Sequence, residues 1–246
     1  MLQTIRRRLH PRRRLNEASV ALAVRFGLLR RVTPISRSFG MDRGGPIDRY
    51  YIDAFLERHR ADIHGRVLEA GGFTNYTRRF GADRVTRGDI LYPKPGFADG
   101  TLVGDLTTGE GIPSGAFDCL IMTQVFPCIY DLTAAVATCH WALKPDGVLL
   151  ATLPGISQIC SYDRQNWGDY WRFTDACVAR LFGDAFGAKH IICFRYADSA
   201  KTERVCGNQP ALSGSERRAS WRRGGGHGRQ SRIVRLLIGS RSSAPI

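Results

Sequence analysis

Short apolar runs alternate with segments of helical periodicity from about residue 66 to residue 196, and this alternation constrains the fold most. The runs that we predict to be strands are 66–70, 83–87, 101–104, 117–123, 147–153 and 189–196. Helices are predicted near 75–81, 131–143 and 174–186, after one that begins at Pro46. Asp131 and Thr174 are the expected N-caps of the last two helices. This order predicts an α/β protein with a Rossmann-like open sheet, mostly parallel, and helices on both faces.

The 246 residues carry a formal net charge of +14, which is unevenly distributed. Residues 1–31 hold nine arginines and one acid, and residues 198–246 hold ten Lys or Arg and three acids. The segment between them, 32–197, holds 17 bases and 18 acids. We therefore predict a basic N-terminal arm, a nearly neutral domain at 32–197 and a basic tail. Because a nucleic-acid enzyme usually shows its basic footprint on the domain itself, nucleic acid is not an expected partner.

The arm, 1–31, begins with two arginine triplets and continues into an apolar stretch around Leu22. Two interpretations stay open: a basic amphipathic helix that makes weak peripheral membrane contact, and a solvated arm with little order. No run of about 18 uncharged apolar residues occurs, so no membrane span is expected. The seven cysteines never form a C-x-x-C pair, which favours a reducing cytoplasm and predicts neither a metal site nor a disulfide framework.

The tail, 198–246, is rich in Gly, Ser and Arg, a composition typical of disordered segments. Within it, only residues 233–238 have the pattern of a strand. We therefore expect residues from about Asn208 onward not to pack as the closing part of the sheet, which leaves the C-terminal hairpin incomplete. Two origins of the abrupt change after Asn208 stay open, a translated shift of reading frame and a genuine basic extension.

The first predicted strand runs into the stretch VLEAGGFTNY, residues 67–76, in which an acid precedes two glycines. In an open parallel sheet the loop after the first strand approaches the ligand closely, and Gly71 and Gly72 suit that place. A pyrophosphate site would need a glycine where Phe73 stands, and Glu69 would repel a phosphate. Glu69 instead suits a cofactor that carries an amino group and a sulfonium charge, as S-adenosylmethionine does.

Two further acids are predicted at the ends of the next two strands. Asp89 follows Glu69 by twenty residues, where a carboxylate can accept both hydroxyls of a ribose. Asp105 follows the third strand, where an adenine amino group would lie. Three acids at the ends of three successive strands predict a site for S-adenosylmethionine, and the alternative is that they are solvated strand ends or caps.

The segment from about residue 36 to residue 196 resembles a class I S-adenosylmethionine-dependent methyltransferase, type 11-like. The resemblance rests on VLEAGG at 67–72, GDIL at 88–91, GDL at 104–106, FDCLIMTQ at 117–124 and LKPDGVLL at 143–150. It implies a Rossmann-like fold that ends in a hairpin of two strands. It also adds Leu106 and Thr123 to the expected cofactor contacts. The sequence departs from the family pattern at Phe73, at Asp146 and after Asn208.

Methyl transfer requires no metal and no covalent nucleophile, because the sulfonium already activates the methyl carbon and the protein mainly aligns two reactants. The acceptor side is expected at Arg49 and Tyr50, where the family places a lid, and at Trp171 and Arg172 after the fifth strand. Aromatic side chains with Arg suit a sugar or an anion. The alternative is that Trp171 is a core residue and Arg172 pairs with a carboxylate. No catalytic residue is assigned, and His140 is expected to be structural.

We therefore expect a cytoplasmic S-adenosylmethionine-dependent methyltransferase that acts on a small molecule or a saccharide intermediate. A catalytically silent binding or scaffold protein of the same fold is the alternative, which Phe73, Asp146 and the unusual tail favour. A nucleic-acid methyltransferase would rest only on the charged termini.

Overall fold

The computed structural model describes residues 46–71, 74–195, 204–205 and 232–239. The chain divides into two compact units, Met1–Ile47 and Asp48–Ile246, and nearly all described residues belong to the second. The expectations for the basic arm and for most of the tail therefore concern residues outside those described. Among the described helices, none is both long enough and apolar enough to cross a membrane.

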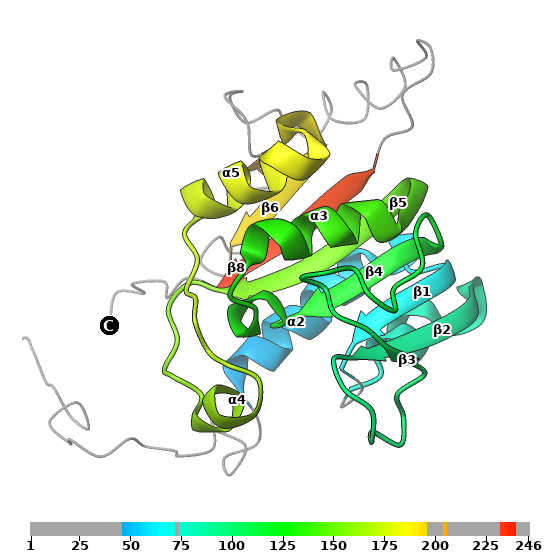
Figure 1. Cartoon of the computed structure of the whole chain (residues 1–246). Coiled ribbons are helices and arrows are strands. Elements are labelled where there is room, and N and C mark those ends of the chain that lie inside the picture. The colour runs from blue at the N-terminus through cyan, green and yellow to red at the C-terminus, as the bar shows by residue number, and fades with distance from the viewer. Residues whose placement is uncertain (1–45, 72–73, 196–203, 206–231, 240–246) are drawn as a thin grey trace, which may run out of the picture. The chain divides into compact units, whose positions relative to one another are not determined.

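The described strands form one sheet in the order β3-β2-β1-β4-β5-β8-β6-β7 (Figure 1). Their bounds are β1 Gly65–Ala70, β2 Val85–Tyr92, β3 Leu102–Val103, β4 Phe117–Thr123, β5 Leu143–Pro154, β6 Ile191–Arg195, β7 Arg204–Val205 and β8 Ile233–Gly239. Neighbouring strands are parallel except β6 and β7, which are antiparallel. The predicted Rossmann-like, mostly parallel sheet is confirmed.

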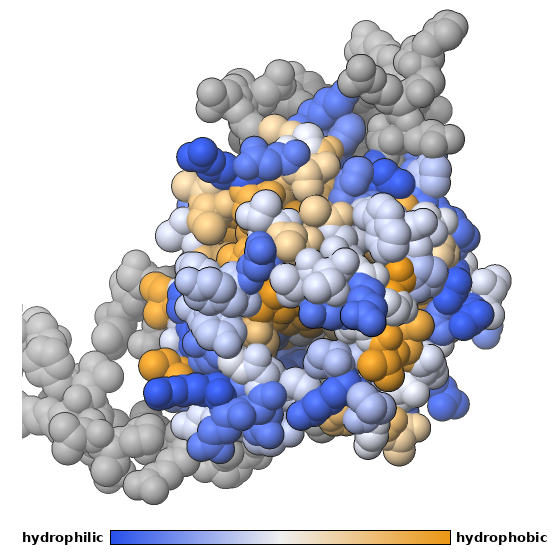
Figure 2. Space-filling model, in the orientation of Figure 1, coloured by the Kyte–Doolittle hydropathy of each residue, from blue (hydrophilic) through white to orange (hydrophobic). Residues whose placement is uncertain are grey.

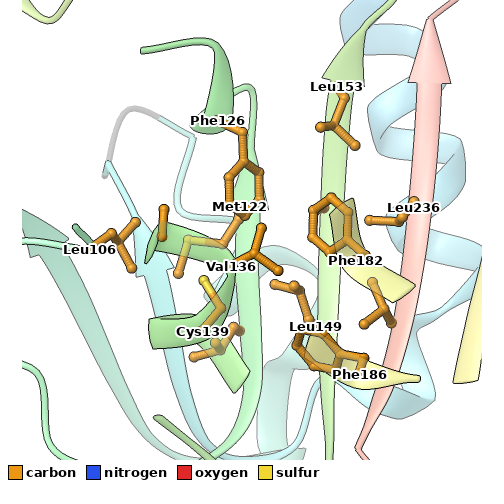
Figure 3. Close-up of a cluster of buried hydrophobic side chains, with 14 of the residues drawn as sticks. Leu106, Met122, Phe126, Val136, Cys139, Leu149, Leu153, Phe182, Phe186 and Leu236 are labelled. Atoms are coloured by element: carbon orange, nitrogen blue, oxygen red, sulfur yellow. The ribbon is translucent and has the colours of Figure 1, made fainter. Parts of the chain in front are cut away.

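One face of the sheet is covered by α3 (Leu132–Ala142) and α5 (Asp175–Phe186). Both helices begin at the predicted N-caps, since Asp131 Oδ1 accepts the Ala134 amide at 3.0 Å and Thr174 Oγ1 accepts the Cys177 amide at 3.2 Å. Beneath them lies the larger buried cluster, part of which Figure 3 shows. The larger part of the core therefore lies on the α3 and α5 side.

The opposite face carries α2 (Ile47–Arg58) and the π-helical turn η4 (Thr77–Gly81). Ile52 and Leu56 of α2 are fully buried against strand residues that include Val67 and Ile121. Helices on both faces explain why the central strands are apolar on both sides, as parallel strands in three-layer proteins are.

Strand β8 lies inside the sheet, which corrects the expectation for the tail. It pairs in parallel with β5 on one side and with β6 on the other. Val234 and Leu236 are buried in the cluster on the α5 side, whereas Leu237 is buried on the α2 side. The prediction that residues from about Asn208 onward would not close the sheet is therefore wrong for Ile233–Gly239. Because β8 is apolar on both faces, its burial between β5 and β6 is favourable, although the composition of the surrounding sequence suggests disorder.

Arg235 attaches β8 to the α2 side of the sheet. Its Nε donates to Asp62 Oδ2 at 2.7 Å and its Nη2 donates to Oδ1 at 3.3 Å. Burial opposes the ionisation of Asp62, but hydrogen bonds from His59 and Arg235 outweigh burial and hold its pKa below the usual value. β8 runs parallel to β6, so these two strands do not form the C-terminal antiparallel hairpin that the resemblance to methyltransferases implies.

The corner before the long part of β5 accommodates the unusual Asp146. Its φ of 62° lies in the left-handed region that favours glycine, which Asp tolerates better than most residues. A Cβ on the next residue, Gly147, would lie 3.0 Å from the Lys144 carbonyl oxygen and 3.1 Å from that of Phe117. Asp146 therefore takes a backbone conformation that glycine adopts more easily, and Gly147 leaves no room for a Cβ without a shift.

Five described cysteines are free thiols: Cys119, Cys128, Cys139, Cys160 and Cys177. Burial raises the pKa of the Cys139 thiol to about 12, so this side chain behaves as a small hydrophobe. Cys193 of β6 is disulfide-bonded, which the spacing of the cysteines did not predict.

Candidate functional site

The carboxyl edge, by which we mean the C-terminal ends of β1 to β5 and the loops that follow them, is the expected ligand site in an open parallel sheet. The ends of β1, β2 and β3 are joined by backbone hydrogen bonds. The Gly71 amide donates to the Leu91 carbonyl at 3.1 Å, and the Gly104 amide donates to the Tyr92 carbonyl at 3.0 Å. The view in Figure 2 shows the surface hollowed between these loops and the segment that contains α4 (Ser161–Asn166).

Glu69 stabilises the chain that follows the glycine loop at this edge. Only 1% of it is exposed, and its carboxylate accepts the amides of Tyr76 at 2.9 Å and Thr77 at 2.8 Å and the Thr77 hydroxyl at 2.8 Å. Burial raises the pKa of Glu69, the hydrogen bonds from Thr77 and Tyr76 oppose the rise, and the charge of Asp99 adds to it. These hydrogen bonds fix the chain after the glycine loop, and the expected contact of Glu69 with a cofactor amino group stays a prediction.

Gly71 leaves room for a ligand to approach the backbone after β1 closely. Its φ is 74°, and a Cβ placed on it would meet no atom within 4 Å. The neighbouring strand end is that of β4, because Glu69 pairs with Ile121, which brings Thr123 level with Gly71. Gly72, the second predicted glycine, lies outside the described residues. A ligand can therefore reach the backbone of Gly71 and the end of β4 together.

Asp89 does not end its strand, which corrects the expectation from the sequence. β2 continues through Tyr92, so that Asp89 lies three residues, about 10 Å, before the carboxyl edge. Its side chain is 2% exposed, and both oxygens are engaged: Oδ2 by Arg66 Nε at 2.8 Å and Oδ1 by Arg87 Nη2 at 3.1 Å. Asp89 is the buried centre of an ion-pair network.

The end of β2 instead presents Tyr92 and Asp99, which sequence reasoning missed. The Tyr92 hydroxyl donates to Asp99 Oδ2 at 3.3 Å, and its ring stacks on Phe97 with centroids 3.9 Å apart and planes at 5°. Asp99 is exposed. The signal in the sequence was the Pro93-Lys-Pro-Gly stretch, which predicts a tight turn that brings the chain back to the strand end.

Asp105 and Leu106 follow β3 as predicted but face different environments. Asp105 is exposed and its Oδ1 accepts the Thr107 amide at 2.7 Å. Leu106 is buried in the larger cluster, beside Met122 in Figure 3. Asp105 is thus available to a ligand at the edge, and Leu106 supports the floor beneath it.

The segment after β5 is held by Arg172. Its guanidinium binds both carboxylate oxygens of Asp169, at 2.5 and 2.9 Å, and the carbonyl oxygens of Ser157 at 3.3 Å and Gln158 at 2.9 Å. The Trp171 indole donates to the Ile129 carbonyl at 3.0 Å. The alternative interpretation of Arg172, a pair with a nearby carboxylate, is confirmed.

Trp167 belongs to the same segment and reaches the loop after β2. Its ring lies 5.6 Å from that of Phe97, and Lys94 Nζ lies 4.9 Å from its centroid. Two loops that are far apart in the sequence therefore meet at the carboxyl edge, with aromatic rings at the contact.

Of the predicted lid residues, Arg49 contacts the site region and Tyr50 does not. Arg49 Nη1 donates to the Tyr76 hydroxyl at 2.9 Å, next to the turn that Glu69 fixes. Tyr50 is 72% exposed and contacts the ring of Tyr51 edge-on. His140 lies within α3, in contact with Phe186, and is remote from this edge. The described residues contain no group of three or more side chains that could hold a metal ion.

No protein-family model and no curated protein match the sequence. Solved structures that are similar in fold include the following three. A proposed sarcosine dimethylglycine methyltransferase from Galdieria sulphuraria has a TM-score of 0.41 at 16% identity, over 56% of this chain and 60% of its own. The complex between a Haloferax volcanii methyltransferase activator and a proposed methyltransferase gives 0.41 at 16% identity, over 63% and 77%. The cyclase SpnF gives 0.42 at 18% identity, over 55% and 56%.

These likenesses concern the course of the chain alone. The match spans about 60% of the first of these proteins, and one of the three is named a cyclase. Because one fold carries unrelated chemistries, function must be inferred from the residues at the carboxyl edge.

Proposed function

We propose that this protein is an S-adenosylmethionine-dependent methyltransferase whose acceptor is a small molecule or a saccharide. The observation that carries the proposal is the arrangement at the carboxyl edge, where the open Gly71 backbone follows β1 and two exposed carboxylates, Asp99 and Asp105, lie in the loops after the next two strands of the sheet, β2 and β3. A cofactor with a positive charge, ribose hydroxyls and an adenine amino group needs such acceptors beside a glycine.

Within this proposal Asp99 accepts the ribose hydroxyls, the role that the sequence suggested for Asp89. Asp99 is exposed and is positioned by the Tyr92 hydroxyl, whereas both oxygens of Asp89 are engaged below the edge. Asp105 accepts the adenine amino group, while Gly71 and Thr123 line the end where the methyl group is transferred. When bound, the cofactor supplies a methyl carbon that is already activated for in-line displacement.

A small or saccharide acceptor is supported by the aromatic contact between Phe97 and Trp167. Flat apolar rings with nearby polar groups are typical of sites for small organic ligands. Arg172 is not proposed as an acceptor contact, because its guanidinium holds Asp169 and neighbouring carbonyls.

Calorimetric titration of the full chain with S-adenosylhomocysteine tests the proposal. We expect saturable binding by the wild type. Asp99→Asn should weaken binding about 10-fold to 100-fold, because hydrogen bonds to a charged acceptor contribute about 1.5–3 kcal/mol each. Asp89→Asn is the matched control: it should lower the free energy of unfolding by about 1–3 kcal/mol, since Arg66 and Arg87 lose their partner, with little change in the affinity of the remaining folded protein.

The absence of any binding heat with well-folded wild type would contradict the proposal. Binding that survives Asp99→Asn but is lost in folded Asp89→Asn would restore the assignment made from the sequence. Binding without transfer to any acceptor tested would favour the catalytically silent alternative.

A further inference from the structure

Gln124, the residue that follows β4, has a backbone conformation that its residue type does not favour. Its φ is 58°, in the left-handed region. Four non-glycine residues in the described part of the chain have a positive φ, and two of them, Asn75 and Asp146, are of types that tolerate it. The other two are Ala82, in the turn before β2 at the opposite edge of the sheet, and Gln124, which lies at the carboxyl edge.

Gln124 lies where the order of the strands reverses. From β1 the chain continues outward to β2 and β3, whereas from β4 it continues outward to β5 on the other side. Thr123 pairs with Thr152 of β5 and is level with Gly71 after β1, so Gln124 lies beside the ends of both neighbouring strands. Ligands of open α/β sheets bind at such a reversal.

Thr152 holds Gln124 in this conformation. The Gln124 backbone amide donates to the Thr152 carbonyl at 3.0 Å and to Thr152 Oγ1 at 3.2 Å, and the side-chain Nε2 donates to the same Oγ1 at 3.3 Å. Thr152 is fully buried, so the hydroxyl that receives these bonds belongs to the core. Because Nε2 faces this hydroxyl, the side-chain oxygen Oε1 is directed away from it.

The side-chain oxygen of Gln124 is available to a ligand. In the described part of the chain no residue donates a hydrogen bond to Oε1, and the side chain is half-buried. A glycine in this place would relieve the backbone strain and would keep the amide bonds to Thr152. Strained residues of this kind cluster at ligand sites, where the strain is tolerated for function. The position of Gln124 therefore indicates a use for its side chain.

An amide oxygen suits one kind of methyl acceptor. As a methyl group is transferred from a sulfonium to a neutral acceptor, positive charge develops on the attacking atom, and a dipole whose negative end faces that atom stabilises the charge. An amine nitrogen can donate an N–H to Oε1 and keep its lone pair for the methyl carbon. A hydroxyl would instead need a base to take its proton, and an amide cannot serve as one.

We propose that Gln124 orients the methyl acceptor through Oε1, and that the acceptor is a neutral amine. This inference rests on the proposed function. The amine lone pair forms the new N–C bond and displaces the neutral thioether, which keeps the electron pair of the broken C–S bond. The methylated ammonium then releases its proton to water. Gln124 takes no proton, and Thr152 is the residue that positions it.

Calorimetric titration of the full chain with two cofactor analogues tests the proposal. Sinefungin carries an ammonium group in the place of the methylated sulfonium, whereas S-adenosylhomocysteine has neither a charge nor a donor there. In Gln124→Gly the ratio of the sinefungin dissociation constant to that of S-adenosylhomocysteine should rise about 10-fold to 100-fold, because a hydrogen bond from a charged donor is lost. The melting temperature should stay within a few degrees of the wild type, since glycine readily adopts the left-handed conformation.

Two further variants separate the contact from its support. Thr152→Val should raise the same ratio by a smaller factor, because the side-chain amide of Gln124 loses the hydroxyl that holds it. Gln165→Ala, which removes an exposed amide side chain from α4, is the matched control and should leave the ratio unchanged.

A ratio that is the same in the wild type and in Gln124→Gly would overturn the inference, while binding of S-adenosylhomocysteine by both would leave the proposed function intact. An equal loss of affinity for both analogues would also overturn it, because Gln124 would then support the site without facing the transferred group. The absence of heat with either analogue in the wild type would contradict the proposed function and this inference with it.

Discussion

Replacement of Leu236 by Ala tests whether the C-terminal strand is part of the core. Leu236 is fully buried, pairs with Ala151 of β5 and Cys193 of β6, and points toward Phe182 of α5 (Figure 3). A Leu→Ala change at such a site costs about 2–5 kcal/mol, from lost transfer free energy and from the cavity left behind. Because a domain is stable by only about 5–15 kcal/mol, the variant should lose a large part of its stability.

Urea denaturation, followed by circular dichroism and by fluorescence, measures this loss. With a slope of about 2 kcal/mol per molar urea, the midpoint should fall by about 1–2.5 M. Ile156→Ala is the control: it removes an exposed side chain and should change the free energy of unfolding by less than about 0.5 kcal/mol. If the unfolding curve of Leu236→Ala coincides with that of the control, β8 does not contribute to the sheet and the original expectation for the tail is right.

Three further predictions concern ion pairs and one close backbone contact. Arg235→Ala leaves the largely buried Asp62 without its guanidinium, so we expect a loss of about 1–3 kcal/mol in urea denaturation; an unchanged midpoint would exclude this attachment of β8. Arg172 holds the pKa of Asp169 below its usual value. The pair therefore stabilises the folded protein above the unfolded pKa of Asp, about 3.9, and this stability is lost as the pH falls through the lower folded pKa. The difference in free energy of unfolding between the wild type and Asp169→Asn should be about 1 kcal/mol or more at pH 7 and should shrink at pH 3. A difference that stays constant between the two pH values would contradict this. Gly147→Ala places a Cβ about 3 Å from two carbonyl oxygens, so the melting temperature should fall by several degrees. Gly183→Ala is the control, because a Cβ there would lie 3.8 Å from Ile191 Cδ1, an ordinary contact; an equal fall in both variants would contradict the prediction.

Sequence patterns placed some residues of the candidate site correctly and misplaced others. Glu69 is the second-last residue of β1, Gly71 follows β1, and Asp105 comes two residues after β3, so all three lie at the carboxyl edge, because the ends of these strands are visible in the sequence. Asp89 was misplaced because GDILY reads equally well as a strand end or as its continuation. Its partner strand decided the question: Leu91 pairs with Ala70, so β2 extends as far as β1 does.

Asp99 and Arg172 show the same limit for side chains. Nothing local in the sequence indicates that Asp99 returns to Tyr92 after seven residues, or that Arg172 binds the carbonyl oxygens of Ser157 and Gln158. Both facts depend on how loops fold against their neighbours. The exposure of Ile156 and Ile159 is of the same kind, because the segment between them is held by Arg172, which binds the carbonyl oxygens of Ser157 and Gln158.

The sequence by itself determined the α/β class, the alternation of strands and helices and the N-caps at Asp131 and Thr174, because periodicity and capping act within a few residues. Only the tertiary structure decided which carboxylate reaches the carboxyl edge and where the last strand goes. Composition indicated a disordered tail, yet the space between β5 and β6 accepts Ile233–Gly239, since both neighbours offer unpaired backbone groups and apolar faces above and below. The burial of β8 depends on the assembled sheet, so no short segment of the sequence predicts it.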